Sequence, residues 1–116
     1  MEQCRFVPAK AEEFVRRAVK TRPAAFKAPS ASYDAVILDP PREGCASSVL
    51  EQVFGELGPA RGIYISCNPE ALARDLRSIV SRGYTIRSLQ PVDMFPHTAH
   101  VETVAVLDRA QESPRR

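Results

Sequence analysis

Apolar residues recur every three or four positions in three stretches of the chain, residues 10–20, 47–57 and 69–82. Charged residues fill the positions between them, so each stretch predicts an amphipathic helix with one buried stripe. The flanking residues agree with these limits. Gly58-Pro59 follows the second stretch, Pro69 suits the first turn of the third, and Gly83 suits its end.

Four other runs have the composition of strands. Residues 33–38 and 61–66 are rich in β-branched and aromatic side chains, which is typical of strands covered on both faces of a parallel sheet. Residues 84–92 and 101–107 predict two more strands. Their connection is too short to hold a crossover helix, so this last pair should be antiparallel. Residues 5–7 predict a further short strand.

The order of these elements predicts an α/β domain with a mostly parallel sheet and an antiparallel C-terminal strand pair. Residues 22–32 contain two prolines and read as a loop, and residues 110–116 read as a polar tail. A chain of 116 residues is long enough for one domain with a real core.

Composition narrows the function classes only a little. The chain is 44% hydrophobic and 26% charged, and its net charge of +2 is too small to indicate a nucleic-acid partner. It has no apolar run of membrane-spanning length and no signal-peptide pattern, so we expect no membrane association. Three cysteines without a CxxC pair argue against a disulfide framework and favour a cytoplasmic setting.

Cys67 is the first candidate for chemistry. It ends the predicted strand 61–66 and is followed by Asn68-Pro69, where the chain must turn. Ligands bind at this edge of open α/β sheets. A buried cysteine is more often an inert small hydrophobe. As a nucleophile it would need a lowered thiol pKa or a nearby base, and the positive end of the helix beginning at Pro69 lies close by.

Two further candidates stand at strand ends. In Asp39-Pro40-Pro41-Arg42 the prolines fix the backbone and could present a carboxylate and carbonyls rigidly to a flat ligand; the alternative is a capped turn with a surface arginine. Glu102, at the start of the last apolar strand, is a candidate general base because partial burial would raise the pKa of its carboxyl group. The alternative is a solvated edge residue.

A metal site has weak support. His97 and His100 are three residues apart in a loop, and with Cys67 they could suggest zinc, but no second paired ligand motif accompanies them. We therefore expect no metal. Cys4 and Cys45 read as packing or surface residues.

Three motifs occur in a fixed order: Asp-Pro-Pro-Arg-Glu-Gly at residues 39–44, Ser-Cys-Asn-Pro at 66–69 followed by Ala-Arg-Asp-Leu at 73–76, and Asp-Met-Phe-Pro-His-Thr-Ala-His-Val-Glu at 93–102. Together they resemble the C-terminal part of the RNA 5-methyluridine (uracil-5) methyltransferase family, over residues 33–107. The resemblance implies a Rossmann-like class I methyltransferase fold. It also implies S-adenosylmethionine as cofactor and carbon 5 of a uridine in tRNA or rRNA as the methylated atom.

The same resemblance implies roles for single residues. Cys67 matches the nucleophile that adds to carbon 6 of the uracil, and Glu102 matches the base that removes the carbon-5 proton. Asp39 matches the aspartate at the cofactor and uracil pocket. Pro40, Arg42 and Asn68 fall on the substrate side of the same motifs.

The chain also departs from the family pattern. No glycine-rich strand-to-helix turn is present, so we interpret residues 1–109 as the C-terminal part of a catalytic domain whose upstream cofactor-binding half is absent. Strand 33–38 would then keep an unpaired apolar edge, which favours a homo-oligomer or pairing with a missing N-terminal segment.

Two other readings stay open. The chain could be a truncated, non-catalytic remnant or RNA-binding module of that fold. It could also resemble an enzyme that methylates amino groups, since Asp-Pro-Pro occurs in those enzymes too and they need no cysteine nucleophile.

Overall fold

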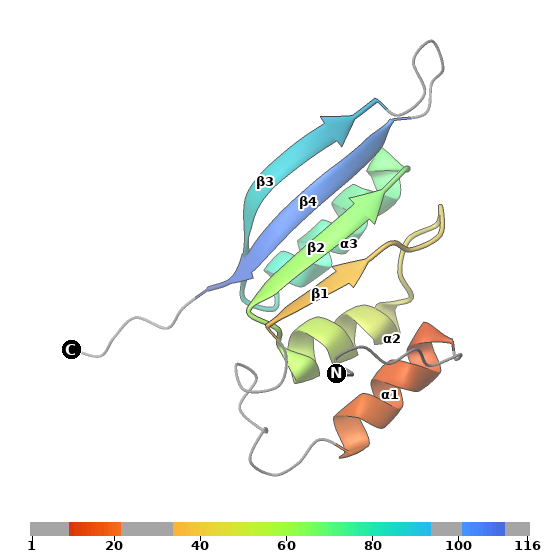
Figure 1. Ribbon diagram of the computed structural model, residues 1–116, viewed down its shortest axis with the longest axis vertical. Helices are drawn as coiled ribbons and strands as arrows, with labels where there is room; N and C mark the ends of the chain where they lie inside the picture. The colour runs from red at the N-terminus through yellow and green to blue at the C-terminus, as the bar shows by residue number, and fades with distance from the viewer. Residues whose placement is uncertain (1–9, 22–33, 94–100, 111–116) are drawn as a thin grey trace, which may run out of the picture.

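The computed structural model describes residues 10–21, 34–93 and 101–110. The helices and strands expected there are all present, with ends shifted by one or two residues (Figure 1). The predicted strand 5–7 and almost all of the predicted tail lie outside the described residues. In chain order the elements are α1 (Ala11–Thr21), β1 (Ala35–Leu38), α2 (Ser47–Leu50), η3 (Glu51–Leu57), β2 (Arg61–Ser66), α3 (Pro69–Val80), β3 (Tyr84–Val92) and β4 (Glu102–Arg109).

The described strands form one four-stranded sheet in the order β1-β2-β4-β3. β1 and β2 are parallel, and β4 runs antiparallel to both β2 and β3, so three strands share one direction. The predicted α/β class with an antiparallel terminal pair is confirmed. The sequence did not predict that β4 would lie between β2 and β3. β1 ends the sheet and pairs with β2 alone among the described strands.

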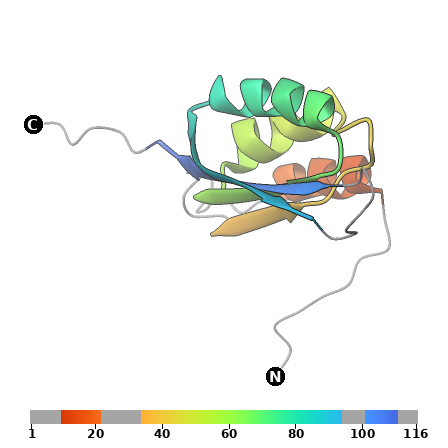
Figure 2. The same ribbon diagram turned by 90° about the horizontal axis from the view of Figure 1, so that it is seen from above.

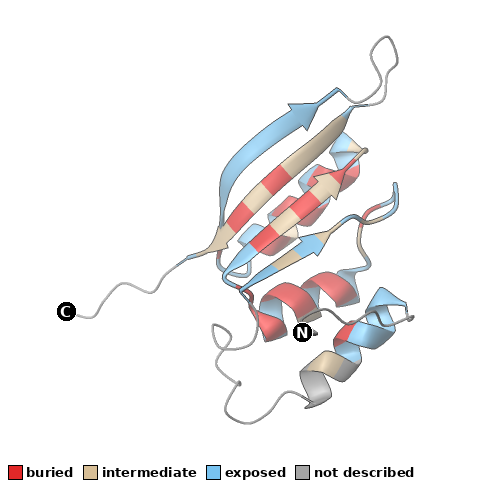
Figure 3. Cartoon of the chain, viewed as in Figure 1, coloured by how far each residue is buried: buried red, intermediate tan, exposed pale blue. Residues whose placement is uncertain are grey.

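The described helices cover a single face of the sheet (Figure 2), so the prediction that strands 33–38 and 61–66 are covered on both faces is wrong within the described residues: Ile37 on β1 is 65% exposed. Figure 2 shows α2 and α3 on one side, and no described helix lies across the other. α1 packs against α2 and η3 beyond the β1 edge. Side chains of β2 and β4 alternate between the two faces, which gives the banding of buried and half-buried residues in Figure 3. The helix-facing residues Tyr64, Ala105 and Leu107 are at most 1% exposed.

The core is closed by tight contacts between η3 and the sheet. The ring of Phe54 meets Tyr84 edge to face, with 5.0 Å between ring centroids. It also lies so close to β2 that a Cβ atom on Gly62 would be 2.7 Å from the Phe54 ring. The Tyr84 hydroxyl donates to the Pro59 carbonyl at 2.5 Å, and burial raises the pKa of Tyr84 to about 12.

The helix ends follow the sequence signals with one exception. Asn68 caps α3 by accepting from the Glu70 amide at 3.1 Å, and Pro69 occupies its first turn. The predicted helix 47–57 changes winding at Glu51. η3 is a π-helix, and the Gly58 amide donates to the carbonyl of Val53, five residues earlier, at 2.8 Å. No described helix is both long enough and apolar enough to cross a membrane.

Candidate active site

The loop after β1 is a turn held by its own backbone. Asp39 is exposed, Pro40 is half-buried, and Arg42 is exposed. The Gly44 amide donates to the Pro41 carbonyl at 2.8 Å, and Gly44 has φ +94°, a conformation that side chains disfavour. The turn therefore fixes the direction in which the residues 39–42 leave the sheet.

Cys67 lies beside this loop. It follows the last residue of β2 and is half-buried. The next residue, Asn68, donates from its side-chain amide to the Arg42 carbonyl at 2.9 Å, while its amide oxygen caps α3. Asn68 thus joins the ends of two neighbouring parallel strands. The carboxyl ends of the parallel strands β1 and β2 lie at the same end of the sheet, as expected. The residues that follow these two strand ends are Asp39, Pro40, Arg42, Cys67 and Asn68.

Glu102 lies at the same end of the sheet, because β4 is antiparallel to β2 and begins where β2 ends. In the antiparallel β2–β4 pair, Ser66 lies opposite Thr103. The β2–β4 pairing ends there, and Cys67 and Glu102 are the residues directly next to this last pair. Tyr64 and Ser66 face the helices, so continued alternation would put Cys67 and Glu102 on the face that no described helix covers, here called the uncovered face. Both residues are half-buried.

A buried polar cluster lies behind the loop. The Asp75 side chain is 2% exposed and accepts three hydrogen bonds. The donors are the Tyr64 hydroxyl at 2.5 Å, the Cys45 backbone amide at 2.9 Å and Arg74 Nε at 3.1 Å. The sequence reasoning missed this cluster, although Asp75 could have been noticed as the acid on the otherwise apolar stripe of α3.

The electrostatics of this cluster acts on the thiol of Cys45. Burial, and next the charge of Asp75, raises the pKa of the Cys45 thiol to about 11. Burial and the hydrogen bond to Asp75 likewise raise the pKa of Tyr64 well above its usual range. At neutral pH Tyr64 is therefore a hydrogen-bond donor and Cys45 a neutral thiol. Cys45 does not meet the requirement for a thiolate nucleophile.

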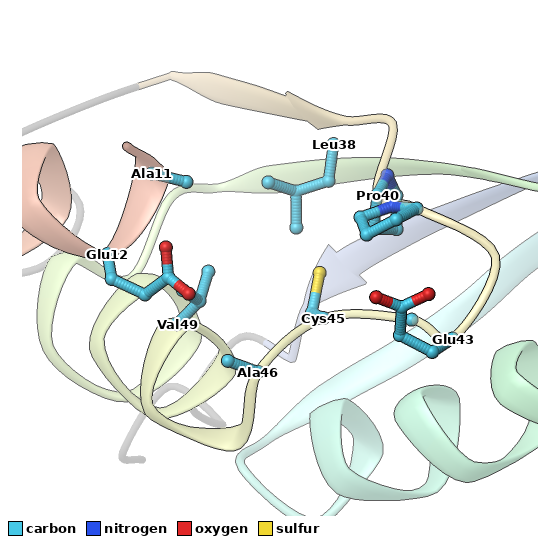
Figure 4. Close-up of a pocket in the computed structure, with 10 residues that line it drawn as sticks. Ala11, Glu12, Leu38, Pro40, Glu43, Cys45, Ala46 and Val49 are labelled. Atoms are coloured by element: carbon cyan, nitrogen blue, oxygen red, sulfur yellow. The ribbon is translucent and has the colours of Figure 1, made fainter. Parts of the chain in front are cut away.

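A cavity of about 360 Å³ opens next to the Asp39–Arg42 turn. Leu38, Pro40 and Val49 give it apolar walls, and Glu12 and Glu43 add two carboxylates (Figure 4). The Cys45 side chain points into it toward Leu38 and Pro40. Its size lies at the lower end of the range for small-molecule sites.

Within the described residues, no group of three histidine, cysteine or acidic side chains could hold a metal ion. His97 and His100 lie outside those residues. The zinc alternative, which needs both histidines, therefore stays a prediction.

Comparison with known proteins points to one class of enzyme. A family model described as tRNA (Uracil-5-)-methyltransferase matches residues 2–110. An uncharacterized RNA methyltransferase of Gloeobacter violaceus is 41% identical over 110 residues, covering 95% of this chain and 21% of its own length. Another, from Thermosynechococcus vestitus, is 46% identical over 103 residues, covering 88% of this chain and 20% of its own.

This chain therefore spans about a fifth of the length of these curated relatives. Among solved structures, M1.HpyAVI matches with a TM-score of 0.57 and 15% identity, over 93% of this chain and 59% of that one. At that identity the likeness concerns the fold alone.

Proposed function

The chain belongs to the tRNA (uracil-5-)-methyltransferase family, and on that premise we propose that it carries the nucleophile and the base for methylating carbon 5 of a uridine in tRNA or rRNA. One observation supports this most: the β2–β4 register ends on the Ser66–Thr103 pair, and Cys67 and Glu102 are the residues directly next to that pair on the two segments. A nucleophile and a base that act on adjacent atoms of one pyrimidine ring must approach it from neighbouring positions.

Cys67 would act first. Carbon 5 of uracil is a weak nucleophile until a thiolate adds to carbon 6. The new S–C6 bond takes its electrons from Cys67, and the C5=C6 electron pair moves toward the O4 carbonyl to give an enolate. Carbon 5 is then electron-rich and can accept a methyl group.

Glu102 would act last. Once carbon 5 is methylated it still carries a proton, which the Glu102 carboxylate accepts. The electrons of that C–H bond re-form the C5=C6 double bond, the C6–S bond breaks, and Cys67 leaves as a thiolate. Both the nucleophile and the double bond are restored. Glu102 is half-buried.

The remaining residues at this edge would hold the ligands. Asp39, Pro40, Arg42 and Asn68 follow the ends of β1 and β2, as Cys67 does, and would position the uracil, which must leave its RNA stack to reach the thiol. The neighbouring cavity suits part of S-adenosylmethionine, because its apolar walls can hold a flat ring and its two carboxylates favour a cation. Asp39 is next to two of its lining residues. When bound, this cofactor would supply the electrophilic methyl group.

The proposal is tested by trapping the adduct with RNA containing 5-fluorouridine, in which the carbon-5 proton is replaced and elimination is blocked. The full polypeptide that contains this chain should form an RNA complex that survives denaturant. Peptide mass spectrometry should locate the attached nucleotide on Cys67 rather than on Cys45. Cys67→Ala should abolish the complex.

Glu102→Gln provides the second arm, with ordinary uridine RNA. Addition should still occur but release should slow, so an adduct should accumulate that wild-type protein does not show. Glu51→Gln, an exposed carboxylate change in η3, serves as the matched control. Methylation that persists in Cys67→Ala would point to an amino-group methyltransferase, and RNA binding without any adduct would point to a non-catalytic RNA-binding module.

A further inference from the structure

Two consecutive residues of α3 hold the loop after β1 on both sides of Gly44. Arg74 donates from its terminal nitrogen to the Glu43 carbonyl at 2.6 Å. Asp75 accepts from the Cys45 amide at 2.9 Å. Arg74 Nε also donates to Asp75 at 3.1 Å, so the guanidinium bridges the carboxylate and the loop.

The N-terminus of α3 makes a third contact with the loop. Asn68, the N-cap of α3, donates to the Arg42 carbonyl at 2.9 Å. One rigid helix, which starts two residues after Cys67, therefore contacts the loop backbone at residues 42, 43 and 45. These bonds fix the distance between Cys67 and the loop, in addition to the hydrogen bond within the loop itself.

The chemistry of each residue fits this task. The buried Asp75 carboxylate has two oxygens and uses them for three donors, of which the Tyr64 hydroxyl comes from the core strand β2. Gly44 allows the loop to approach α3 closely, because a Cβ at this position would clash with the Arg74 guanidinium and lie 2.7 Å from an Asp75 oxygen. Arginine is needed because a lysine ammonium could not span both partners in the same fork geometry.

We propose that Tyr64, Arg74 and Asp75, here named the loop clamp, are positioning residues that set the Asp39–Arg42 turn at the correct place relative to Cys67. This inference rests on the proposed function. The clamp acts by placing the residues that would hold the uracil, so that carbon 6 lies over the thiol. A small displacement of such a turn lowers the reaction rate far more than it lowers binding.

The decisive variants are Arg74→Ala and Arg77→Ala. Both remove one exposed arginine from α3, but Arg77 contacts the loop through no hydrogen bond or ion pair found in the structure. Arg74→Ala should lower the rate of 5-fluorouridine adduct formation at saturating RNA by about a hundredfold. The dissociation constant for RNA should stay within about twofold of wild type, and Arg77→Ala should match wild type in rate. Arg74→Lys should fail to restore the rate.

A second measurement follows the contacts of the clamp directly and does not depend on the adduct-forming reaction. In ¹⁵N-labelled protein, Arg74→Ala and Gly44→Ala should both shift the Cys45 backbone amide and the Asn68 side-chain amide resonances, whereas Arg77→Ala should not. Gly44→Ala disturbs the contact between the loop and α3 without changing any clamp residue, so it is a second test of the proposal.

The possible failures are distinguishable. A wild-type adduct with an unchanged rate in Arg74→Ala would overturn the clamp and leave the proposed function standing. So would a loss of RNA affinity with no loss of rate at saturation, because Arg74 would then be a phosphate contact. If wild-type protein forms no adduct at all, the proposed function fails and the clamp's catalytic role fails with it.

Discussion

The two faces of the sheet are built from the same strands but differ in what covers them. On the helix-covered face, Tyr64 and Leu107 are buried by η3 and α3. On the uncovered face, Ile63 and Val106 lie opposite each other and are half-buried, and Ile37 is 65% exposed. Residues at the surface of a sheet are usually polar, whereas this face carries a row of β-branched side chains.

The comparison teaches where the candidate chemistry lies. The covered face provides stability and holds the clamp, while the uncovered face leads along its apolar row to Cys67 and Glu102. An exposed sheet face that carries a row of apolar side chains is typical of a surface that packs against more protein or a ligand.

The largest effect is expected from truncating the covered face. Leu107→Ala removes a side chain with no exposed surface and should lower the free energy of unfolding by about 3 kcal/mol, through lost burial and the cavity left behind. Ile63→Ala on the uncovered face should cost only about 1 kcal/mol. Urea denaturation of both variants measures the difference. Equal losses would mean that the uncovered face is packed in solution, for instance by a second copy of the chain.

A smaller effect should appear in the state of association. β1 pairs on one edge only among the described strands, and Ile37 projects from it into solvent. We expect the chain to self-associate through this edge, because an unpaired apolar strand is a template for pairing. Ile37→Lys should lower the average mass measured by light scattering at high protein concentration. Ala73→Lys, with the same charge change on the exposed side of α3, should not. A wild-type chain that stays monomeric would contradict this expectation.

The smallest effect concerns the charged end of the uncovered face. The hydrogen bond from Arg61 Nε to Asp108, 2.7 Å long, is the main reason that the pKa of Asp108 lies below its ordinary value of 3.8. A lowered folded-state pKa contributes stability that is complete above the ordinary value and is lost as the pH falls through the folded value. Asp108→Asn should therefore destabilise the chain slightly at neutral pH and by less at about pH 2.

This contribution should be small because the pair is solvent-exposed. Thermal unfolding from about pH 5 to about pH 2, at low and high salt, measures it. An equal effect of Asp108→Asn at both ends of that range would show that the ion pair contributes nothing.

Most of the fold could be predicted because its signals are local. Periodicity gave the helices, apolar runs gave the strands, and Asn68, Pro69 and Gly58 marked ends that the structure confirms. The position of β4 between β2 and β3 was not predictable in this way, since strand order depends on long-range pairing that no local pattern records. The π-helix at η3 was missed because its apolar positions also fit an ordinary α-helix.

The candidate site was predicted in part. Strand ends pointed to Cys67 and to the Asp39–Arg42 turn, and the structure places them together. That Glu102 reaches the same edge depends on the β2–β4 register. The clamp was not foreseen, because the importance of Asp75 follows from its contacts with Tyr64 and Cys45, which are distant in sequence.

The strand order also has a consequence for folding. β4 is the last of the four strands in the chain, yet it lies inside the sheet, and Arg61 pairs with Asp108 across 47 positions. Such non-local pairing is costly in loop entropy and forms slowly. Until β4 inserts, β3 has no neighbour among the described strands, and Cys67 stands at a strand end without Glu102. Under the proposed function, a half-folded chain would therefore hold the nucleophile without its base, and turnover would require the completed sheet.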